Sequence, residues 1–229
     1  MKTIGLIGGM SWESTLTYYK LINTGIKQNL GGLHSAKCLL HSVDFAEIEQ
    51  LQQQNRWVEA GVLLGKAAAG LQTAGADCIL LCTNTMHKCA SQITDAITIP
   101  FIHIATATAG ALLAAGITKV GLLGTRATMQ QPFYTQKLTE KGLQVLVPGP
   151  EEQQEMNRII FEELCLGKIE QTSKQACLHM VKQLANQGAE AVILGCTEIG
   201  LLVQQADTTV PLFDTTEIHA NAAVAFALQ

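Results

Sequence analysis

The sequence predicts an α/β fold built from two similar, pseudo-symmetric lobes with mostly parallel sheets. Short apolar runs alternate with longer amphipathic stretches, which is typical of βαβ units. We expect strands at Thr3–Ile7, Lys37–Ser42 and Cys78–Leu81, and helices at residues 14–28 and 45–73. In addition, three segments recur in the same order 111 to 116 residues later, which indicates an internal repeat.

The internal repeat sets the expected domain organisation. The paired segments, which share their apolar pattern and their glycine or cysteine positions, are 2–8 with 118–124, 75–83 with 188–197, and 99–102 with 210–213. Each lobe therefore opens with an apolar strand and later has a strand that ends in Cys-Thr. We expect an N-terminal lobe of residues 1–98 plus 210–229 and a C-terminal lobe of residues 99–209, with the active site in the cleft between them.

Composition argues against several classes of protein. With 229 residues, 48% of them hydrophobic, the chain can bury a sizeable core. A net charge of −4 and the lack of a Lys/Arg cluster disfavour a nucleic-acid partner. No apolar stretch reaches about 18 residues, so no membrane span is expected. Seven cysteines without a secretion signal indicate reduced thiols in the cytoplasm, and their spacing predicts no metal site.

Cys82 and Cys196 occupy matching points of the repeat. Each ends an apolar run and is followed by threonine, in Cys82-Thr-Asn-Thr85 and in Gly195-Cys-Thr-Glu198. The carboxyl ends of strands in open α/β sheets are where ligands bind. A helix that starts directly after each cysteine would favour the thiolate through its dipole and its unpaired N–H groups. The other five cysteines lack such partners and are interpreted as core or helix-face residues.

Two thiols placed in this way suit the inversion of a carbon next to a carboxylate. One group must remove a proton from one face while the other returns a proton to the opposite face, and cysteine can be tuned to do both. The weakly acidic carbon requires preorganised donors in a dry site. We expect the backbone N–H groups and side chains of Thr83, Asn84, Thr85 and Thr197 to bind the carboxylate. No pyridoxal-type lysine motif is recognisable, which fits a reaction without a cofactor.

The chain resembles the aspartate/glutamate racemase superfamily along essentially its whole length. The motifs that carry the resemblance are Gly8-Gly-Met-Ser-Trp12, Cys82-Thr-Asn-Thr85, Gly195-Cys-Thr-Glu-Ile199 and Phe213-Asp-Thr215. They are similar to the aspartate racemase branch and differ from the Asp-Ser-Gly and Cys-Thr-His motifs of glutamate racemases of cell-wall synthesis. The resemblance implies a pyridoxal-independent amino-acid racemase, often a homodimer, that acts on a small amino acid.

The resemblance also implies roles for individual residues. Cys82 and Cys196 match the two catalytic positions, and Asn84 and Thr85 match residues that hold the α-carboxylate. A distal carboxylate needs a cation, for which Arg126 and Lys168 are the candidates; Lys168 resembles a basic residue of some aspartate racemases. The remaining candidates, each with an equally simple structural explanation, are Met10, Ser11 and Glu198.

Several alternatives remain open at this stage. Aspartate racemases can carry an arginine after the second strand, where this chain has Asp44–Glu47, so a broader amino-acid range is one alternative. Related chemistry of the hydantoin racemase, maleate isomerase or malonate decarboxylase type is another, although the decarboxylases usually need one thiol. A third is a non-enzymatic amino-acid-binding protein. His87 is interpreted as structural, and His103 and His219 are not assigned to catalysis.

Overall fold

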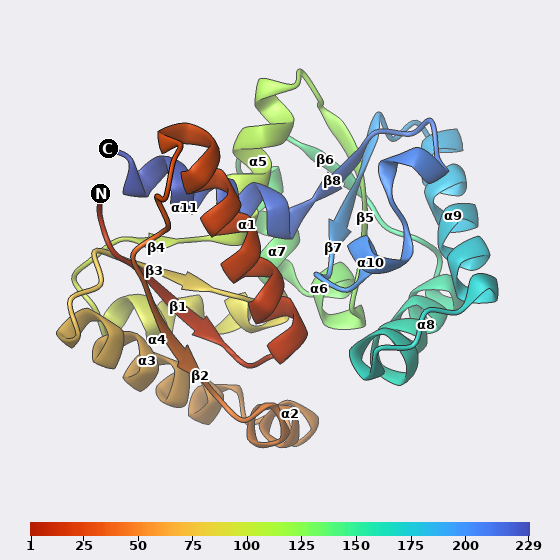
Figure 1. Cartoon of the computed structure of the whole chain (residues 1–229). Coiled ribbons are helices and arrows are strands. Elements are labelled where there is room, and N and C mark those ends of the chain that lie inside the picture. The colour runs from red at the N-terminus through yellow and green to blue at the C-terminus, as the bar shows by residue number, and fades with distance from the viewer. The chain divides into compact units, whose positions relative to one another are not determined.

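The computed structural model describes all residues from Met1 to Gln229 and shows two compact α/β units (Figure 1). The first unit comprises Met1–Ile104 and His219–Gln229, and the second comprises Ala105–Ile218. Each unit has a four-stranded parallel sheet, and the predicted α/β fold class is confirmed. No helix has the length and apolar character that crossing a bilayer would require.

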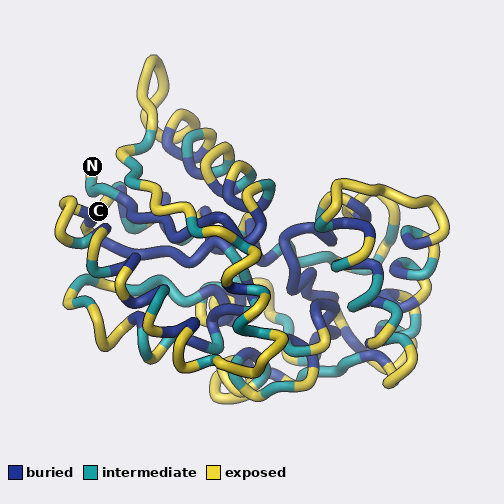
Figure 2. The backbone as a smooth tube through the Cα atoms, turned by 90° about the horizontal axis from the view of Figure 1, so that it is seen from below, coloured by how far each residue is buried: buried dark blue, intermediate teal, exposed yellow.

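The first unit has the strand order β2-β1-β3-β4. Its elements in chain order are β1 (Ile4–Gly8), α1 (Trp12–Leu30), β2 (Cys38–Ser42), α2 (Phe45–Gln53), α3 (Trp57–Thr73), β3 (Cys78–Leu81), the 3₁₀ helix η1 (Thr85–Cys89), α4 (Ala90–Asp95) and β4 (Phe101–Ile102). The last helix, α11 (Thr215–Ala227), brings the end of the chain back to this unit. The central strands β1 and β3 are fully buried. Figure 2 shows buried backbone, in dark blue, running through the interior of the unit that holds both chain ends.

Alternation along β3 determines which face of the first sheet each side chain joins. Ile79 and Leu81 pack in the cluster that α3 contributes to, whereas Cys78, Leu80 and Cys82 pack in the cluster of α1 and α11. Both faces of a parallel sheet are covered by helices, so its strands are apolar throughout. The period of two therefore assigns Cys82 to the side of the sheet covered by α1 and α11.

The second unit repeats the topology of the first, with strand order β6-β5-β7-β8. Its elements are α5 (Ile104–Ala114), β5 (Lys119–Gly124), α6 (Arg126–Gln130), α7 (Pro132–Thr139), β6 (Gln144–Leu146), α8 (Pro150–Arg158), the π-helix η2 (Ile159–Glu163), the 3₁₀ helix η3 (Leu164–Leu166), α9 (Gln171–Asn186), β7 (Ala191–Gly195), α10 (Ile199–Leu202), the 3₁₀ helix η4 (Gln205–Asp207) and β8 (Leu212–Asp214). The three repeated sequence segments thus correspond to β1 with β5, β3 with β7, and β4 with β8.

The chain returns to the first unit later than the repeat alone suggests. Residues 210–229 were expected in the N-terminal lobe, but β8 pairs with β7 of the second sheet, with Ile193 opposite Phe213. The return occurs within α11, because of all the residues after Ile104 only those from His219 onward belong to the first unit. The ladder hydrogen bonds of β8 hold residues 212–214 in the second sheet, and the apolar residues Ala220, Ala223 and Val224 pack in the first core.

Gly9 is required by the tight turn between β1 and α1. Its φ is +95°, and a Cβ on this residue would lie 2.1 Å from the carbonyl oxygen of Val43. Its N–H donates to Thr15 Oγ1 over 2.8 Å. The left-handed backbone and the close approach of Val43 together leave room only for glycine.

Replacing Gly9 should therefore destabilise the protein strongly. We expect Gly9→Ala to lower the free energy of unfolding by about 2–4 kcal/mol, because both the positive φ and the clash with backbone oppose a Cβ. Gly70→Ala is the matched control: Gly70 is exposed in α3, has open space around its Cβ position, and should gain up to about 1 kcal/mol. Urea denaturation measures both, and equal stabilities for the two variants would contradict this interpretation of the turn.

Candidate active site

Cys82 follows directly on β3, and hydrogen bonds fix the backbone around it. Its N–H donates to the Ile7 carbonyl over 2.9 Å, and its own carbonyl accepts from Ser14 Oγ over 2.9 Å. The Thr83 N–H donates to the Leu81 carbonyl over 2.9 Å, which turns the chain sharply after the strand. The dipeptide that carries the thiol is therefore held by its own strand, by β1 and by α1.

The start of α1 provides one of these contacts. Ser11 is the N-cap of α1, with its side-chain oxygen accepting from Ser14 N, and Thr15 Oγ1 donates to the Ser11 carbonyl over 3.0 Å. Ser11 is thus engaged in capping, and Met10 lies buried in the apolar cluster that includes α3 residues. Met10 and Ser11, which were predicted to bind substrate, therefore lie in the turn just before α1, the helix whose Ser14 contacts Cys82.

The residues after Cys82 form a polar turn. Asn84 is buried, while Thr83 and Thr85 are half-buried. Asn84 directly precedes η1, whose first turn closes with the bond from His87 N–H to the Asn84 carbonyl, 3.0 Å long. Within the first unit, the structure therefore gathers Cys82, Thr83, Asn84 and Thr85 at the carboxyl end of β3.

Cys196 stands at the equivalent point of the second unit. It follows β7 directly, and its thiol donates to the Glu198 Oε2 atom over 3.0 Å. Cys196, Thr197 and Glu198 are all buried. The Ile199 N–H donates to the Cys196 carbonyl over 3.1 Å and starts α10. The thiol thus has a defined partner for its proton.

Burial raises the pKa of both thiols. For Cys82, loss of hydration is the main cause, and the negative charge of an ionised Cys38 adds to it. For Cys196 the pKa is raised well above its ordinary value, first by burial, then by the charge of Glu198 and of Cys165. Both groups are therefore held as neutral thiols in the absence of a ligand.

This differs from the expectation that helix N-termini would favour the thiolates. The helix after Cys82 begins only at Thr85 and is a short 3₁₀ helix, and α10 after Cys196 has four residues. Helices of this length provide a weak dipole, and desolvation outweighs it. The polar turns place donors at the strand ends, but they do not ionise the thiols by themselves.

The two basic candidates lie in the second unit and are exposed. Arg126 is the first residue of α6, and its N–H donates to Asn157 Oδ1 over 3.0 Å. Lys168 ends the turn after η3, where its N–H donates to the Glu163 carbonyl over 2.9 Å. Glu163 is in turn fixed by Arg158 Nη1 at 2.7 Å. The backbone of both candidates is therefore anchored, while their side chains are exposed.

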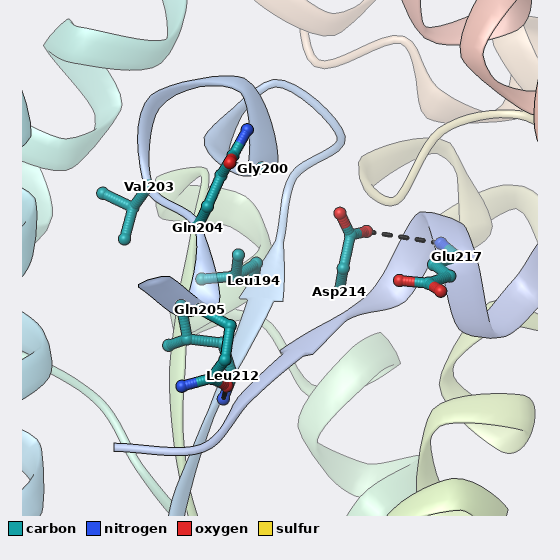
Figure 3. A pocket seen from close by; sticks show the side chains of 8 residues that line it. All are labelled: Leu194, Gly200, Val203, Gln204, Gln205, Leu212, Asp214 and Glu217. Atoms are coloured by element: carbon teal, nitrogen blue, oxygen red, sulfur yellow. Dashed lines mark hydrogen bonds between the residues drawn. The ribbon is translucent and has the colours of Figure 1, made fainter. Parts of the chain in front are cut away.

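A pocket of about 180 Å³ lies beside α10 in the second unit (Figure 3). Asp214 Oδ1 accepts from Thr216 N at 2.8 Å and from Glu217 N at 3.3 Å and so caps α11. A Cβ on Gly200 would lie 2.5 Å from Asp214 Oδ2, so α10 approaches this carboxylate closely. Cys196 is not among the lining residues. The Phe213-Asp-Thr215 motif thus joins β8 to α11.

The whole chain is similar to known racemases in sequence and in structure. A sequence model described as Asp/Glu/Hydantoin racemase matches residues 7–223. The chain belongs to the Asp/Glu/hydantoin racemase family. The resemblance seen in the sequence motifs is thereby confirmed.

Three individual proteins show how similar the chain is to known structures and sequences. A crystal structure of an Asp/Glu racemase candidate from Yersinia pestis is 56% identical, with a TM-score of 0.94 and 100% coverage of both chains. An aspartate racemase homologue from Pyrococcus horikoshii is 38% identical, with a TM-score of 0.86 and 100% coverage of both chains. The broad specificity amino-acid racemase RacX of Bacillus subtilis is 26% identical over 157 residues, covering 69% of this chain and 67% of its own.

Sequence reasoning missed one contact of this candidate site and did not specify another. Ser14, which donates to the Cys82 carbonyl, was not singled out, although hydroxyl residues gather at positions 11, 14 and 15 at the start of α1. His87 was interpreted as structural, and its ring indeed bonds backbone groups, one of which is the Thr83 carbonyl in the turn after Cys82. No group of three or more His, Cys, Asp or Glu side chains is arranged to hold a metal ion.

Proposed function

We propose that this member of the family is a cofactor-independent racemase of free amino acids, with aspartate and glutamate as the first candidate substrates. The observation that carries the proposal is the equivalence of Cys82 and Cys196. Cys82 directly follows β3, and Cys196 directly follows β7. These two strands occupy the same position in sheets that have the same strand order. One thiol removes the α-proton and the other returns a proton, and the roles exchange for the opposite enantiomer.

Donors at the two strand ends support the binding of an amino acid. We propose that Asn84 and Thr85 hold the α-carboxylate together with Thr83 and Thr197, and that Met10 and Ser11 form the wall beside them. A carboxylate is favoured by several preorganised donors in a site from which water is excluded. We propose that Arg126 or Lys168 binds a distal carboxylate, because each is an exposed cation of the second unit, Arg126 at the start of α6 and Lys168 in the turn after η3.

Glu198 supports an acid–base role for Cys196. The thiol donates to Glu198 Oε2 over 3.0 Å, so the carboxylate is positioned to accept the thiol proton. Burial and the charge of Glu198 both raise the pKa of this thiol, so the thiol can act as a base only after it has given its proton to an acceptor, and Glu198 is the acceptor in contact with it. We propose that Glu198 orients Cys196 and takes part in its ionisation when substrate is bound.

The test is formation of the D-enantiomer without added cofactor. Purified protein is incubated with L-aspartate, L-glutamate and a panel of other L-amino acids, and the products are resolved by chiral chromatography. We expect D-aspartate or D-glutamate to form. Turnover across the panel would instead identify the broad-specificity alternative, for which the likeness to RacX is the supporting observation.

Other outcomes separate the remaining alternatives. Turnover of a hydantoin or of maleate, with no amino-acid racemisation, would assign related isomerase chemistry. Binding of amino acids without any turnover would assign a non-enzymatic binding protein. Either result would overturn the proposed activity.

We further propose a homodimer that acts in the cytoplasm. Trp12, Leu16 and Tyr19 are 64%, 58% and 51% exposed and follow each other at helical spacing on α1, so they form one apolar stripe. All seven cysteines are free, which suits a reducing compartment.

The stripe gives a direct test of the dimer. Leu16→Glu together with Tyr19→Lys should convert a dimer into a monomer in sedimentation velocity, because charges replace the apolar contact. The matched control is Val58→Glu, since Val58 is 68% exposed on α3, away from the stripe. A protein that sediments as a monomer before any substitution would contradict the proposal.

A further inference from the structure

His87 has a buried ring whose two nitrogens both have backbone partners. Nδ1 lies 2.8 Å from the Thr83 carbonyl oxygen, and Nε2 accepts from the Ile104 N–H over 3.2 Å. The side chain is 2% exposed. Thr83 directly follows Cys82, whereas Ile104 starts α5 after β4. The ring therefore joins the turn after the thiol to the segment that leaves the first sheet.

These partners determine the tautomer. A backbone N–H can only donate, so Nε2 must be the acceptor, and the proton then lies on Nδ1 and is donated to the Thr83 carbonyl. Burial, with additional repulsion from His103 and His219, keeps the pKa of His87 well below its usual range. The ring is neutral and has one permitted hydrogen-bonding arrangement.

Aromatic neighbours keep the ring in place. The His103 ring centroid is 4.6 Å away, that of Phe101 is 5.4 Å away and that of His219 is 5.7 Å away. His219 is itself fixed, since it bonds the Ile102 carbonyl at 2.6 Å and Tyr18 Oη at 2.8 Å. The orientation of His87 is thus determined by packing as well as by its hydrogen bonds.

The Thr83 contact completes the set of backbone bonds around the thiol. Cys82 N–H, Cys82 carbonyl and Thr83 N–H bond Ile7, Ser14 and Leu81, and the Thr83 carbonyl is the fourth group. Two of the four bonds are made by side chains, that of Ser14 on the Cys82 carbonyl and that of His87 on the Thr83 carbonyl. Loss of it would leave the Thr83 carbonyl without that partner and let the turn relax.

We propose that His87 is a positioning residue for Cys82, which it serves by donating from Nδ1 to the Thr83 carbonyl. The inference rests on the proposed two-thiol reaction, in which each thiol abstracts the α-proton of one enantiomer. Displacement of a catalytic group by about 1 Å can reduce a rate by 10²-fold. A defect confined to Cys82 must therefore slow proton abstraction from one enantiomer more than from the other.

Two amide substitutions separate positioning from general stability. The side-chain amide of His87→Asn lies near the place of Nδ1 and can still donate to Thr83, whereas that of His87→Gln lies near the place of Nε2 and can bond only Ile104. Exchange of the α-proton in D2O is followed by NMR for each enantiomer of the best substrate. The enantiomer whose exchange is lost in Cys82→Ala defines the Cys82-dependent direction.

The expected results are specific to that direction. His87→Gln should slow exchange of the Cys82-dependent enantiomer about tenfold more than exchange of the other. His87→Asn should recover most of the lost rate and so remove most of this difference. Cys78→Ala is the matched control, because Cys78 is a buried residue of β3 in the same unit that belongs neither to the rings around His87 nor to the bonds of the turn, and it should affect both enantiomers alike.

Other results would overturn either the inference about His87 or the proposed function. Equal slowing of both enantiomers in His87→Gln, or no advantage of Asn over Gln, would overturn the inference while leaving the racemase reaction intact. Lack of exchange with unmodified protein would instead overturn the proposed function. The unmodified protein offers a second test: ¹⁵N NMR at neutral pH should show His87 neutral and protonated at Nδ1, and the Nε2 tautomer would overturn the assignment.

Discussion

Replacing either Cys82 or Cys196 with alanine is expected to abolish racemisation. Loss of a positioned acid or base reduces rates by about 10²- to 10⁴-fold, and here every turnover needs both thiols, one as the base and the other as the acid. Alanine introduces no hydroxyl that would need a buried partner. Chiral chromatography and NMR in D2O measure racemisation and α-proton exchange on the same samples.

Each single variant should still exchange one enantiomer. In Cys196→Ala the remaining thiol can remove and return a proton on its own face, and in Cys82→Ala the opposite enantiomer should exchange. Cys78→Ala is the matched control, because Cys78 lies on β3 four residues earlier, on the same face of the sheet, and is equally buried. Racemisation within about tenfold of the unmodified rate in either active-site variant would contradict the two-thiol reaction.

The second large effect is expected for Glu198→Gln. Its carboxylate accepts a hydrogen bond from the Cys196 thiol over 3.0 Å, and a hydrogen bond to a charged group contributes about 1.5–3 kcal/mol. We therefore expect kcat/KM to fall about 10- to 100-fold. Glu162→Gln, an exposed residue of η2 with the same charge change, should have little effect.

The same substitution should change the pH dependence in a predictable direction. The negative charge of Glu198 raises the pKa of Cys196 and so keeps the thiol protonated up to higher pH. Removing this charge lowers the pKa, and the protonated donor is lost at lower pH. The alkaline limb of kcat/KM, for the direction in which Cys196 donates, should then move to lower pH.

Glu198→Asp separates the effect of charge from that of contact. It keeps the charge but shortens the side chain, so the alkaline limb should stay closer to that of the unmodified protein while the rate still falls. An alkaline limb that moves to higher pH in Glu198→Gln would contradict the electrostatic assignment.

The local sequence pattern was sufficient to predict the two strands that end directly before Cys82 and Cys196. The apolar run Cys78–Leu81 is β3 with the bounds expected, and the repeated run that ends at Gly195 is β7. Such runs between polar turns have few alternatives in an α/β chain, so the strand ends, and with them the positions of Cys82 and Cys196, follow from the sequence. The repeat also predicted two similar sheets, which share one strand order.

Contacts between distant segments could not be predicted in this way. Ser14 bonds the Cys82 carbonyl across 68 residues, and His87 bonds Ile104 across 17. The pairing of β8 with β7 likewise depends on ladder bonds, whereas sequence similarity alone placed Val210 and the following residues in the first lobe. The thiol environment was mispredicted because desolvation depends on tertiary packing, while the helix dipole was inferred from local sequence.

The most direct test of the two-thiol account is the early fate of deuterium in a reaction started from one enantiomer in D2O. If one thiol removes the α-proton and another supplies the new one, the product should carry solvent deuterium from the first turnovers while the remaining substrate keeps its proton. We predict this asymmetry for the best substrate in both directions. Equal early labelling of substrate and product, or transfer of the original proton to the product, would contradict the account, because a single group would then be handling both faces.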